Sequence, residues 1–156
     1  MSEERLVVID MQEGFLENKP RKDVESVVTV IENLVAWARK SNIPITFTMF
    51  PEDRYGALVP RMSPKSGEIV VKNDSSAFSS PEFCQKMQGA WKLYVTGANV
   101  HACVGLTVKE AAKRNLEVVV FRNATLYHEQ YLAKTVQTWL SLMLTHGVHI
   151  TNFLKE

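Results

Sequence analysis

The feature that most constrains this fold is an alternation between short apolar runs and segments of helical periodicity. Between the runs, apolar residues recur every three or four positions, as Val24, Val27 and Ile31 do. Strands that are apolar along their whole length are typical of parallel sheets covered on both faces. We therefore predict a three-layer α/β/α domain with a six-stranded, mostly parallel, Rossmann-like sheet. The predicted strands occupy residues 5–10, 43–50, 68–72, 91–97, 117–121 and 148–151.

Four helices are predicted between these strands. Asp23 is the expected N-cap of the first, and Ser79 or Ser80 caps a short one that begins at Pro81. Residues 51–67 contain three prolines and two glycines, which predicts a loop. The predicted helices occupy residues 23–40, 81–88, 101–115 and 129–146.

Composition and charge narrow the class of protein. The chain of 156 residues, 46% of them hydrophobic, fits one domain spanning 1–156. Its 18 basic and 17 acidic residues form no long run of one sign, so we expect neither a nucleic-acid nor a membrane partner. Two cysteines are too few for a disulfide scaffold, and the start MSEERLVVIDMQ does not resemble a signal peptide. These features predict a reduced, cytoplasmic protein.

Three reactive side chains directly follow predicted strands. Asp10 ends the first strand, Lys72 ends the third, and Cys103 follows the fourth by one short turn. Open α/β sheets bind ligands at the carboxyl ends of their strands, near the point where the strand order reverses. We therefore expect these three side chains to meet at one edge of the sheet.

Each of them also has a purely structural interpretation. An aspartate after a strand often caps a turn, a lysine there is usually solvated, and free cysteines are mostly buried packing residues. Cys103, however, falls in the first turn of a predicted helix, where unpaired N–H groups and the helix dipole lower a thiol pKa. Cys84 lies inside the helix 81–88 without that setting, and we predict that it only packs.

Three motifs extend this prediction. The segments IDMQEGF (9–15), VVKNDSSAF (70–78) and VTGANVHACVGLTVKEAAKRNLEVVVFRNAT (95–125) resemble those of the isochorismatase-like cysteine hydrolases, a family that includes nicotinamidases and N-carbamoylsarcosine amidase-like enzymes. The resemblance covers nearly the whole chain in the same order. It implies the isochorismatase-like hydrolase fold and a catalytic triad of Asp10, Lys72 and Cys103.

The resemblance also assigns supporting residues. It implies a cis peptide bond between Ala98 and Asn99, and an oxyanion hole formed by the backbone N–H groups of Asn99 and Cys103. It implies a substrate pocket that includes Gln12, Phe15, Phe78 and Val100.

The sequence differs from the family motifs at several positions, and these differences restrict which properties the resemblance implies for this chain. Nicotinamidases hold a metal with an aspartate and histidines after the second strand, whereas residues 51–67 contain no histidine. Glu52 and Asp53 alone make a poor transition-metal site, so we predict no metal and no cofactor. Val100 stands where many relatives have threonine. His101 precedes Cys103 by two positions, which do not face each other on a helix, so we do not expect it to be the base.

The sequence thus predicts a cysteine hydrolase for a small molecule, acting on the C–N bond of an amide or carbamoyl group through a thioester. Two alternatives stay open: an isochorismatase-type vinyl-ether hydrolase, and a binding protein that kept the pocket without turnover. Residues 51–67, Phe78 and residues 125–131 with Tyr127 are expected to select the substrate. We also expect a homo-oligomer, a dimer or tetramer, with surplus apolar surface near Trp37 or Trp139.

Overall fold

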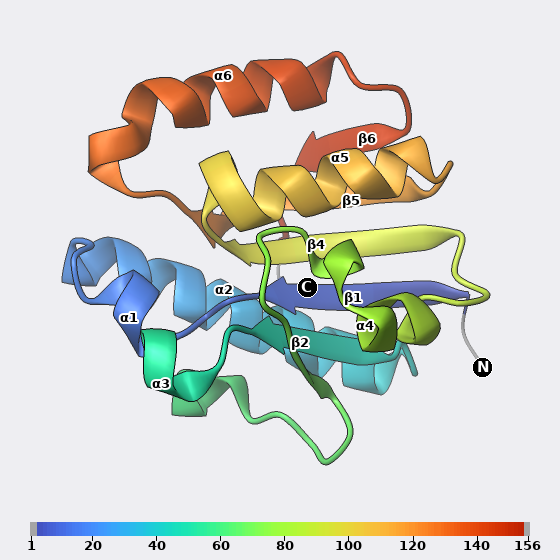
Figure 1. Cartoon of the computed structure of the whole chain (residues 1–156), viewed down its shortest axis with the longest axis horizontal. Helices are drawn as coiled ribbons and strands as arrows, with labels where there is room; N and C mark the ends of the chain where they lie inside the picture. Colours follow the sequence, from blue (N-terminus) through green and yellow to red (C-terminus); the bar gives the residue numbers. More distant parts are fainter. Residues whose placement is uncertain (1–2, 155–156) are drawn as a thin grey trace.

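Six strands form one parallel sheet in the computed structural model, which describes residues 3–154 (Figure 1). Every neighbouring pair is parallel, and the strand order is β3-β2-β1-β4-β5-β6. The predicted fold class is confirmed. The strands are β1 (Glu4–Ile9), β2 (Ile45–Met49), β3 (Ile69–Val71), β4 (Lys92–Ala98), β5 (Glu117–Leu126) and β6 (Val148–Thr151).

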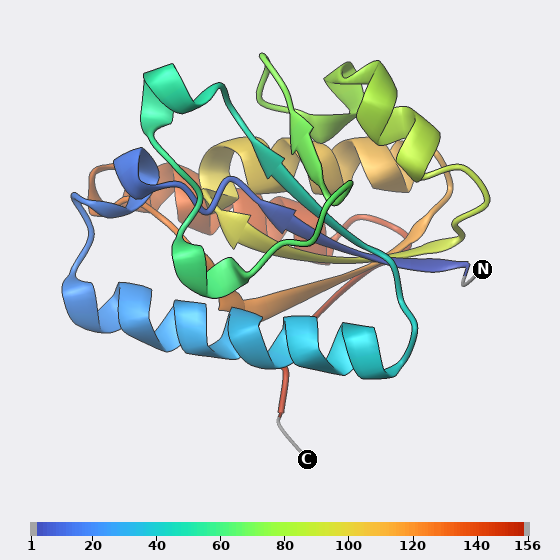
Figure 2. The ribbon, with the colours of Figure 1, turned by 90° about the horizontal axis from the view of Figure 1, so that it is seen from below.

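Helices cover both faces of the sheet. The long helix α2 (Arg21–Lys40) lies along one face, and α4 (Pro81–Lys86), α5 (Gly105–Lys113) and α6 (Leu132–Met143) lie on the other (Figure 2). Shorter helical turns lie in the loops. Two are α-helical, α1 (Glu13–Leu16) and α3 (Glu52–Tyr55). The others are the 3₁₀ turns η1 (Pro60–Met62), η2 (Ala77–Ser79) and η4 (Glu129–Tyr131), and the π turn η3 (Val100–Val104).

The central strand shows why the sheet needs cover on both sides. Successive side chains of a strand point to opposite faces. Leu6 and Val8 of β1 accordingly join the apolar core beneath α2, whereas Val7 and Ile9 join the core beneath α4, α5 and α6. All four are 0% exposed. A run that is apolar at every position is therefore what this strand requires.

Several predicted boundaries were wrong. Helix α2 begins at Arg21 after Pro20, so Asp23 lies in its first turn and is not the N-cap. The predicted loop 51–67 contains α3 and η1. The predicted helix 101–115 is broken, because Ala102 has φ −129° and ψ −105°, and regular α-helix starts only at Gly105. Ser80 does cap α4, accepting a hydrogen bond from the Phe83 N–H group.

Helix α6 also packs differently from the sequence prediction. Trp139 is buried, as a residue covering the sheet should be. Four other apolar residues, spaced three or four positions apart as the sheet-facing side of a helix would be, are instead 47% to 62% exposed and form a stripe of Leu132, Val136, Leu140 and Met143. Within residues 3–154, no helix is long and apolar enough to cross a membrane.

Candidate active site

Asp10 and Cys103 follow two adjacent strands at the point where the strand order reverses. From β1 the chain builds β2 and β3 on one side, then returns to place β4 on the other. Ile9 and Gly97 are paired in register, so Asp10 lies beside the start of the turn that leads to Cys103. This edge, where the arrowheads of β1, β2 and β4 end in Figure 1, is where α/β sheets bind ligands.

Lys72 reaches this point from the edge strand β3. Its Nζ lies 3.9 Å from the centre of the Phe50 ring and 3.0 Å from Asp10 Oδ2. It donates hydrogen bonds to the carbonyl oxygens of Asp74 and Ser75, at 2.9 and 3.1 Å. The side chains of Lys72 and Asp10 are both 0% exposed, so water does not screen the ion pair.

The Asp10 carboxylate is the centre of this arrangement. Thr48 Oγ1 donates a hydrogen bond to Oδ1 at 3.0 Å. Oδ2 is held mainly by its 3.0 Å ion pair with Lys72, whose ammonium also donates two hydrogen bonds to backbone carbonyls. The thiol of Cys103 lies close enough to this carboxylate for each group to shift the pKa of the other. A carboxylate with spare acceptor capacity beside a thiol can take its proton.

The backbone after β4 is shaped to bring Cys103 to this carboxylate. Gly97 has φ 114°, which favours glycine, and an added Cβ would lie 2.1 Å from the Ile9 carbonyl oxygen. The peptide bond between Ala98 and Asn99 is cis. The Asn99 carbonyl oxygen then accepts hydrogen bonds from the N–H groups of Ala102 and Val104, both at 3.1 Å. These contacts fix the turn on either side of Cys103.

The resting protonation state differs from the sequence prediction. The pKa of the Cys103 thiol is raised to about 12. Burial is the main cause, and the negative charge of Asp10 adds to it by more than Lys72 and Ser75 take away. Burial also raises the pKa of Asp10, against the opposing effect of the Lys72 charge. The prediction of a thiolate favoured by a helix N-terminus was wrong, because Cys103 lies before the first residue of α5, Gly105. Cys103 therefore keeps its proton at neutral pH beside the Asp10–Lys72 pair.

Two of the predicted pocket residues lie around this edge. Gln12 is 0% exposed; its Nε2 donates to the carbonyl oxygens of Phe50 and Gly56, both at 2.9 Å, and its Oε1 accepts from the Phe50 N–H group. Gln12 therefore holds the loop after β2 and has no group left for a ligand. Phe15 is only half-buried, and its ring stacks on Tyr55 at 4.3 Å.

The other two predicted pocket residues are core residues. The Phe78 ring packs edge-on against Phe83 at 5.0 Å and beneath the Arg114 guanidinium at 4.6 Å. Arg114 follows the C-terminal end of α5, the end away from Cys103, and a place for Phe78 in the substrate pocket stays a prediction. Val100 is 1% exposed and packs in the core beneath α5 and α6.

Sequence reasoning missed residues that hold the triad. Thr48, near the end of β2, contacts Asp10, and Phe50, just after β2, contacts Lys72. Ser75 lies near Cys103 and lowers its pKa. The motif VVKNDSSAF contains Ser75, and a threonine at the end of a buried strand was the available signal for Thr48.

The remaining candidates lie apart from the triad. His101 stacks on Tyr131 at 4.5 Å. Cys84 donates a hydrogen bond to the Phe78 carbonyl oxygen at 3.2 Å, as befits a packing residue. Glu52 and Asp53 occupy the exposed first turn of α3. The described residues 3–154 contain no group of three or more His, Cys, Asp or Glu residues arranged to hold a metal ion.

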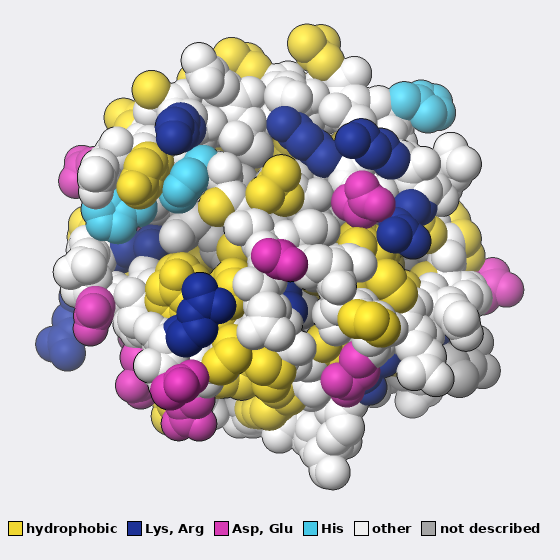
Figure 3. Space-filling view, in the orientation of Figure 1, with side chains coloured by type: hydrophobic (Ala, Val, Ile, Leu, Met, Phe, Trp, Pro, Cys, Tyr) yellow, Lys and Arg dark blue, Asp and Glu magenta, His cyan; other side chains and the backbone are white. Residues whose placement is uncertain are grey.

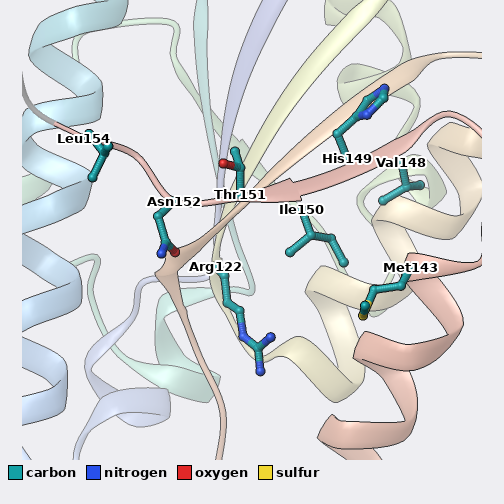
Figure 4. Close-up of a pocket in the computed structure, with 8 residues that line it drawn as sticks. All are labelled: Arg122, Met143, Val148, His149, Ile150, Thr151, Asn152 and Leu154. Carbon is teal, nitrogen blue, oxygen red and sulfur yellow. The ribbon is translucent and has the colours of Figure 1, made fainter.

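A groove of about 750 Å³ lies on another part of the molecule (Figure 4). It follows the exposed edge strand β6, with Ile150 and Thr151 on one side, Arg122 from β5 and Met143 from α6. None of the triad residues lines it. The groove is therefore not the candidate active site, although it is large. The triad lies at the ends of β1 and β4.

Comparisons with known proteins identify the family of this chain. Residues 4–136 match the isochorismatase domain family. The chain belongs to this hydrolase family. It is 28% identical over 134 residues to the secreted isochorismatase effector Isc1 of Verticillium dahliae, covering 76% of this chain and 70% of that protein.

Solved structures share the fold of this family member. The YcaC gene product of Escherichia coli, described as an octameric hydrolase of unknown specificity, superimposes with a TM-score of 0.84 at 18% identity, covering 96% of this chain and 74% of its own. N-carbamoylsarcosine amidase from Thermoplasma acidophilum superimposes with a TM-score of 0.78 at 17% identity, covering 96% and 95%. These likenesses confirm the isochorismatase-like fold.

Proposed function

We propose that this isochorismatase-family protein hydrolyses a C–N bond in an amide or carbamoyl group of a small molecule, with Cys103 as nucleophile and Asp10 as general base. The observation that carries the proposal is the buried contact of Asp10 with both Lys72 and Cys103. A thiol, a proton acceptor and a fixed cation within one water-shielded cluster are the parts that acyl transfer to cysteine needs. The amidase among the structural relatives is consistent with this reaction class.

The first half of the reaction forms a thioester. The Cys103 sulfur attacks the carbonyl carbon while its proton passes to Asp10, so no free thiolate is required at the start. The N–H groups of Asn99 and Cys103, on either side of the turn after β4, stabilise the oxyanion. The C–N bond then breaks, and the proton held on Asp10 moves to the departing nitrogen.

The second half restores the enzyme. Water attacks the thioester carbon and gives a proton to Asp10, and the C–S bond breaks with return of that proton to the Cys103 sulfur. Lys72 stays protonated throughout and balances the charge on Asp10 whenever the carboxylate is ionised. Acid and amine or ammonia are the products, so atoms and charge balance over the cycle.

A second candidate reaction is hydrolysis of a vinyl ether, as in isochorismate. The specific support is the matched family and the relative described as a secreted isochorismatase effector. This route is acid chemistry at the ether and does not use Cys103. Isochorismate should therefore give pyruvate with the wild type and with Cys103→Ala alike if this is the reaction.

The experiment is a substrate panel of amides, carbamoyl compounds and nitriles, tested with three proteins. We expect the wild type and Cys84→Ala to hydrolyse the same amide or carbamoyl substrate at similar rates. We expect Cys103→Ala to lose that activity. Retention of amide turnover by Cys103→Ala, or its equal loss in the Cys84 variant, would reject Cys103 as nucleophile.

We further propose that the protein assembles into a homo-oligomer through the exposed stripe on α6. The stripe is apolar, and the octameric E. coli relative supports assembly within this fold. Light scattering of the wild type and of Leu140→Lys tests it, with a smaller species expected for the variant and an unchanged mass counting against this interface. A cytoplasmic location stays a prediction, and the Verticillium relative is described as secreted.

A further inference from the structure

A buried lysine near the candidate active site has no ionic partner. Lys19, between α1 and α2, is 8% exposed. Its Nζ donates a hydrogen bond to the Phe15 carbonyl oxygen, and it forms no ion pair with a carboxylate of residues 3–154. Burying an ammonium without a counter-charge is unfavourable, so buried lysines are usually paired. A cation left unpaired in this way is suited to a ligand that brings the negative charge.

Lys19 lines a cavity of about 400 Å³ between the start of α2 and the segment after β5. Leu126, on the opposite wall, is in register with Ala98, the residue that begins the turn to Cys103. Tyr127, predicted to help select the substrate, lies on the same wall. The wall that contains Leu126 is therefore paired with the strand end that leads to Cys103, and the cavity is large enough for part of a small molecule.

Three basic side chains lie near His101, which precedes Cys103 by two residues. The charges of Lys19, Lys134 and His128 all act on His101, whose ring stacks on Tyr131. The Nδ1 atom of His101 is buried and has no hydrogen-bond partner among residues 3–154. Figure 3 shows histidine side chains beside lysine or arginine side chains on this part of the surface, toward the left of the view.

The acidic groups of the cavity lie at its outside. Asp23 and Glu129 also line it, but both residues are exposed and neither pairs with Lys19. They limit the net positive charge, so a single carboxylate fits better than a dianionic phosphate. A lysine ammonium binds a carboxylate as a point charge, without the arginine fork typical of phosphate sites.

We propose that Lys19 binds a carboxylate of the substrate, so that the hydrolysed molecule carries an anionic group beside its amide. This inference rests on the proposed function for the reacting bond, but the binding of the carboxylate can be tested separately.

The test uses binding to Cys103→Ala, which the proposed reaction makes inactive. The probes are malonamate, succinamate and glutaramate, each compared by calorimetry with the corresponding neutral diamide. We expect at least one monoamide to bind about tenfold or more tightly than its diamide, the size of one hydrogen bond to a charged group. Adding Lys19→Met should remove that difference, Lys19→Arg should keep part of it, and Lys22→Met, at an exposed lysine of α2, should leave it unchanged.

Two results would overturn the carboxylate subsite. One is that all three monoamides bind no more tightly than their diamides. The other is that Lys19→Met weakens monoamide and diamide equally, or weakens neither. Turnover distinguishes this failure from that of the proposed function: hydrolysis of neutral amides without carboxylate preference rejects only the subsite. Carboxylate-selective binding without any amide turnover by the wild type rejects only the reaction.

Discussion

Replacing Lys19 with methionine should make the folded protein more stable at neutral pH. Burial lowers the pKa of Lys19 from 10.5 to about 8, so the folded state holds the ammonium less readily than the unfolded chain does. At about 1.4 kcal/mol for each pKa unit, the charged form costs about 3 kcal/mol at pH 7. Methionine fills similar space without the charge, but it leaves the Phe15 carbonyl without its donor, a loss of about 1 kcal/mol.

The net gain is therefore about 2 kcal/mol at pH 7, or a rise in melting temperature of about 4–8 °C for a domain of this size. The sign follows from proton linkage. Between pH 8 and 10.5 the unfolded chain still binds a proton that the folded protein has released, so wild-type stability rises with pH relative to the variant. The advantage of Lys19→Met should shrink over that window and reverse near pH ~10, where the lost hydrogen bond outweighs the remaining charge penalty.

Urea unfolding measures this stability difference and its dependence on pH. The proteins to compare at pH 7, 8.5 and 10 are the wild type, Lys19→Met and the exposed control Lys22→Met. We expect the control to follow the wild type at each pH. A Lys19→Met variant that is less stable than the wild type at pH 7, or a stability difference that does not change with pH, would refute the assignment of Lys19 as an unpaired buried cation.

Three other substitutions test the site. Lys72→Met should destabilise the fold by about 3–5 kcal/mol in urea unfolding at pH 7, because it leaves the buried Asp10 carboxylate unpaired, and the loss should shrink at pH 5 as Asp10 binds a proton. Gly97→Ala should give little soluble protein, since its Cβ would lie 2.1 Å from the Ile9 carbonyl oxygen; expression with a normal melting temperature would contradict that geometry. Asp10→Asn should speed alkylation of Cys103 by iodoacetamide at pH 8, because the charge that raises the thiol pKa is gone, while amide turnover falls about 100-fold or more. Parallel changes in both rates would count against Asp10 as the proton acceptor.

Sequence periodicity was sufficient for the sheet because β1 to β5 each bury residues on at least one face, and β6 packs the partly buried Val148 and Ile150 against the core. The shared location of Asp10, Lys72 and Cys103 could be predicted from the ends of their strands alone. The carboxyl ends of parallel strands lie at the same edge of the sheet. The prediction of a helix over 101–115 was wrong at its N-terminal end, because regular α-helix begins only at Gly105. Val104, Val108 and Ala111 keep helical spacing whether or not the preceding turn is regular, so the pattern does not reveal the kink at Ala102.

Other features depend on three-dimensional surroundings that no local pattern carries. The thiol pKa of Cys103 reflects its burial and its distance from the Asp10 charge, which outweigh any effect of a helix terminus. The direction of the Phe78 ring is set by Phe83 and Arg114, distant along the chain from the triad. Lys19, in the loop sequence ENKPRK, has the composition of an exposed turn, and only the packing of that loop shows that its ammonium is buried.

Trapping of the covalent intermediate addresses Cys103 itself. The wild type, mixed with an amide substrate from the panel and quenched in acid during turnover, would be digested and its peptides weighed by mass spectrometry. We expect the mass of the acyl group on the peptide that contains Cys103, none on the peptide that contains Cys84, and none in Cys103→Ala. Amide hydrolysis that proceeds in Cys103→Ala, or an acyl group found on another residue, would contradict the central role of this thiol.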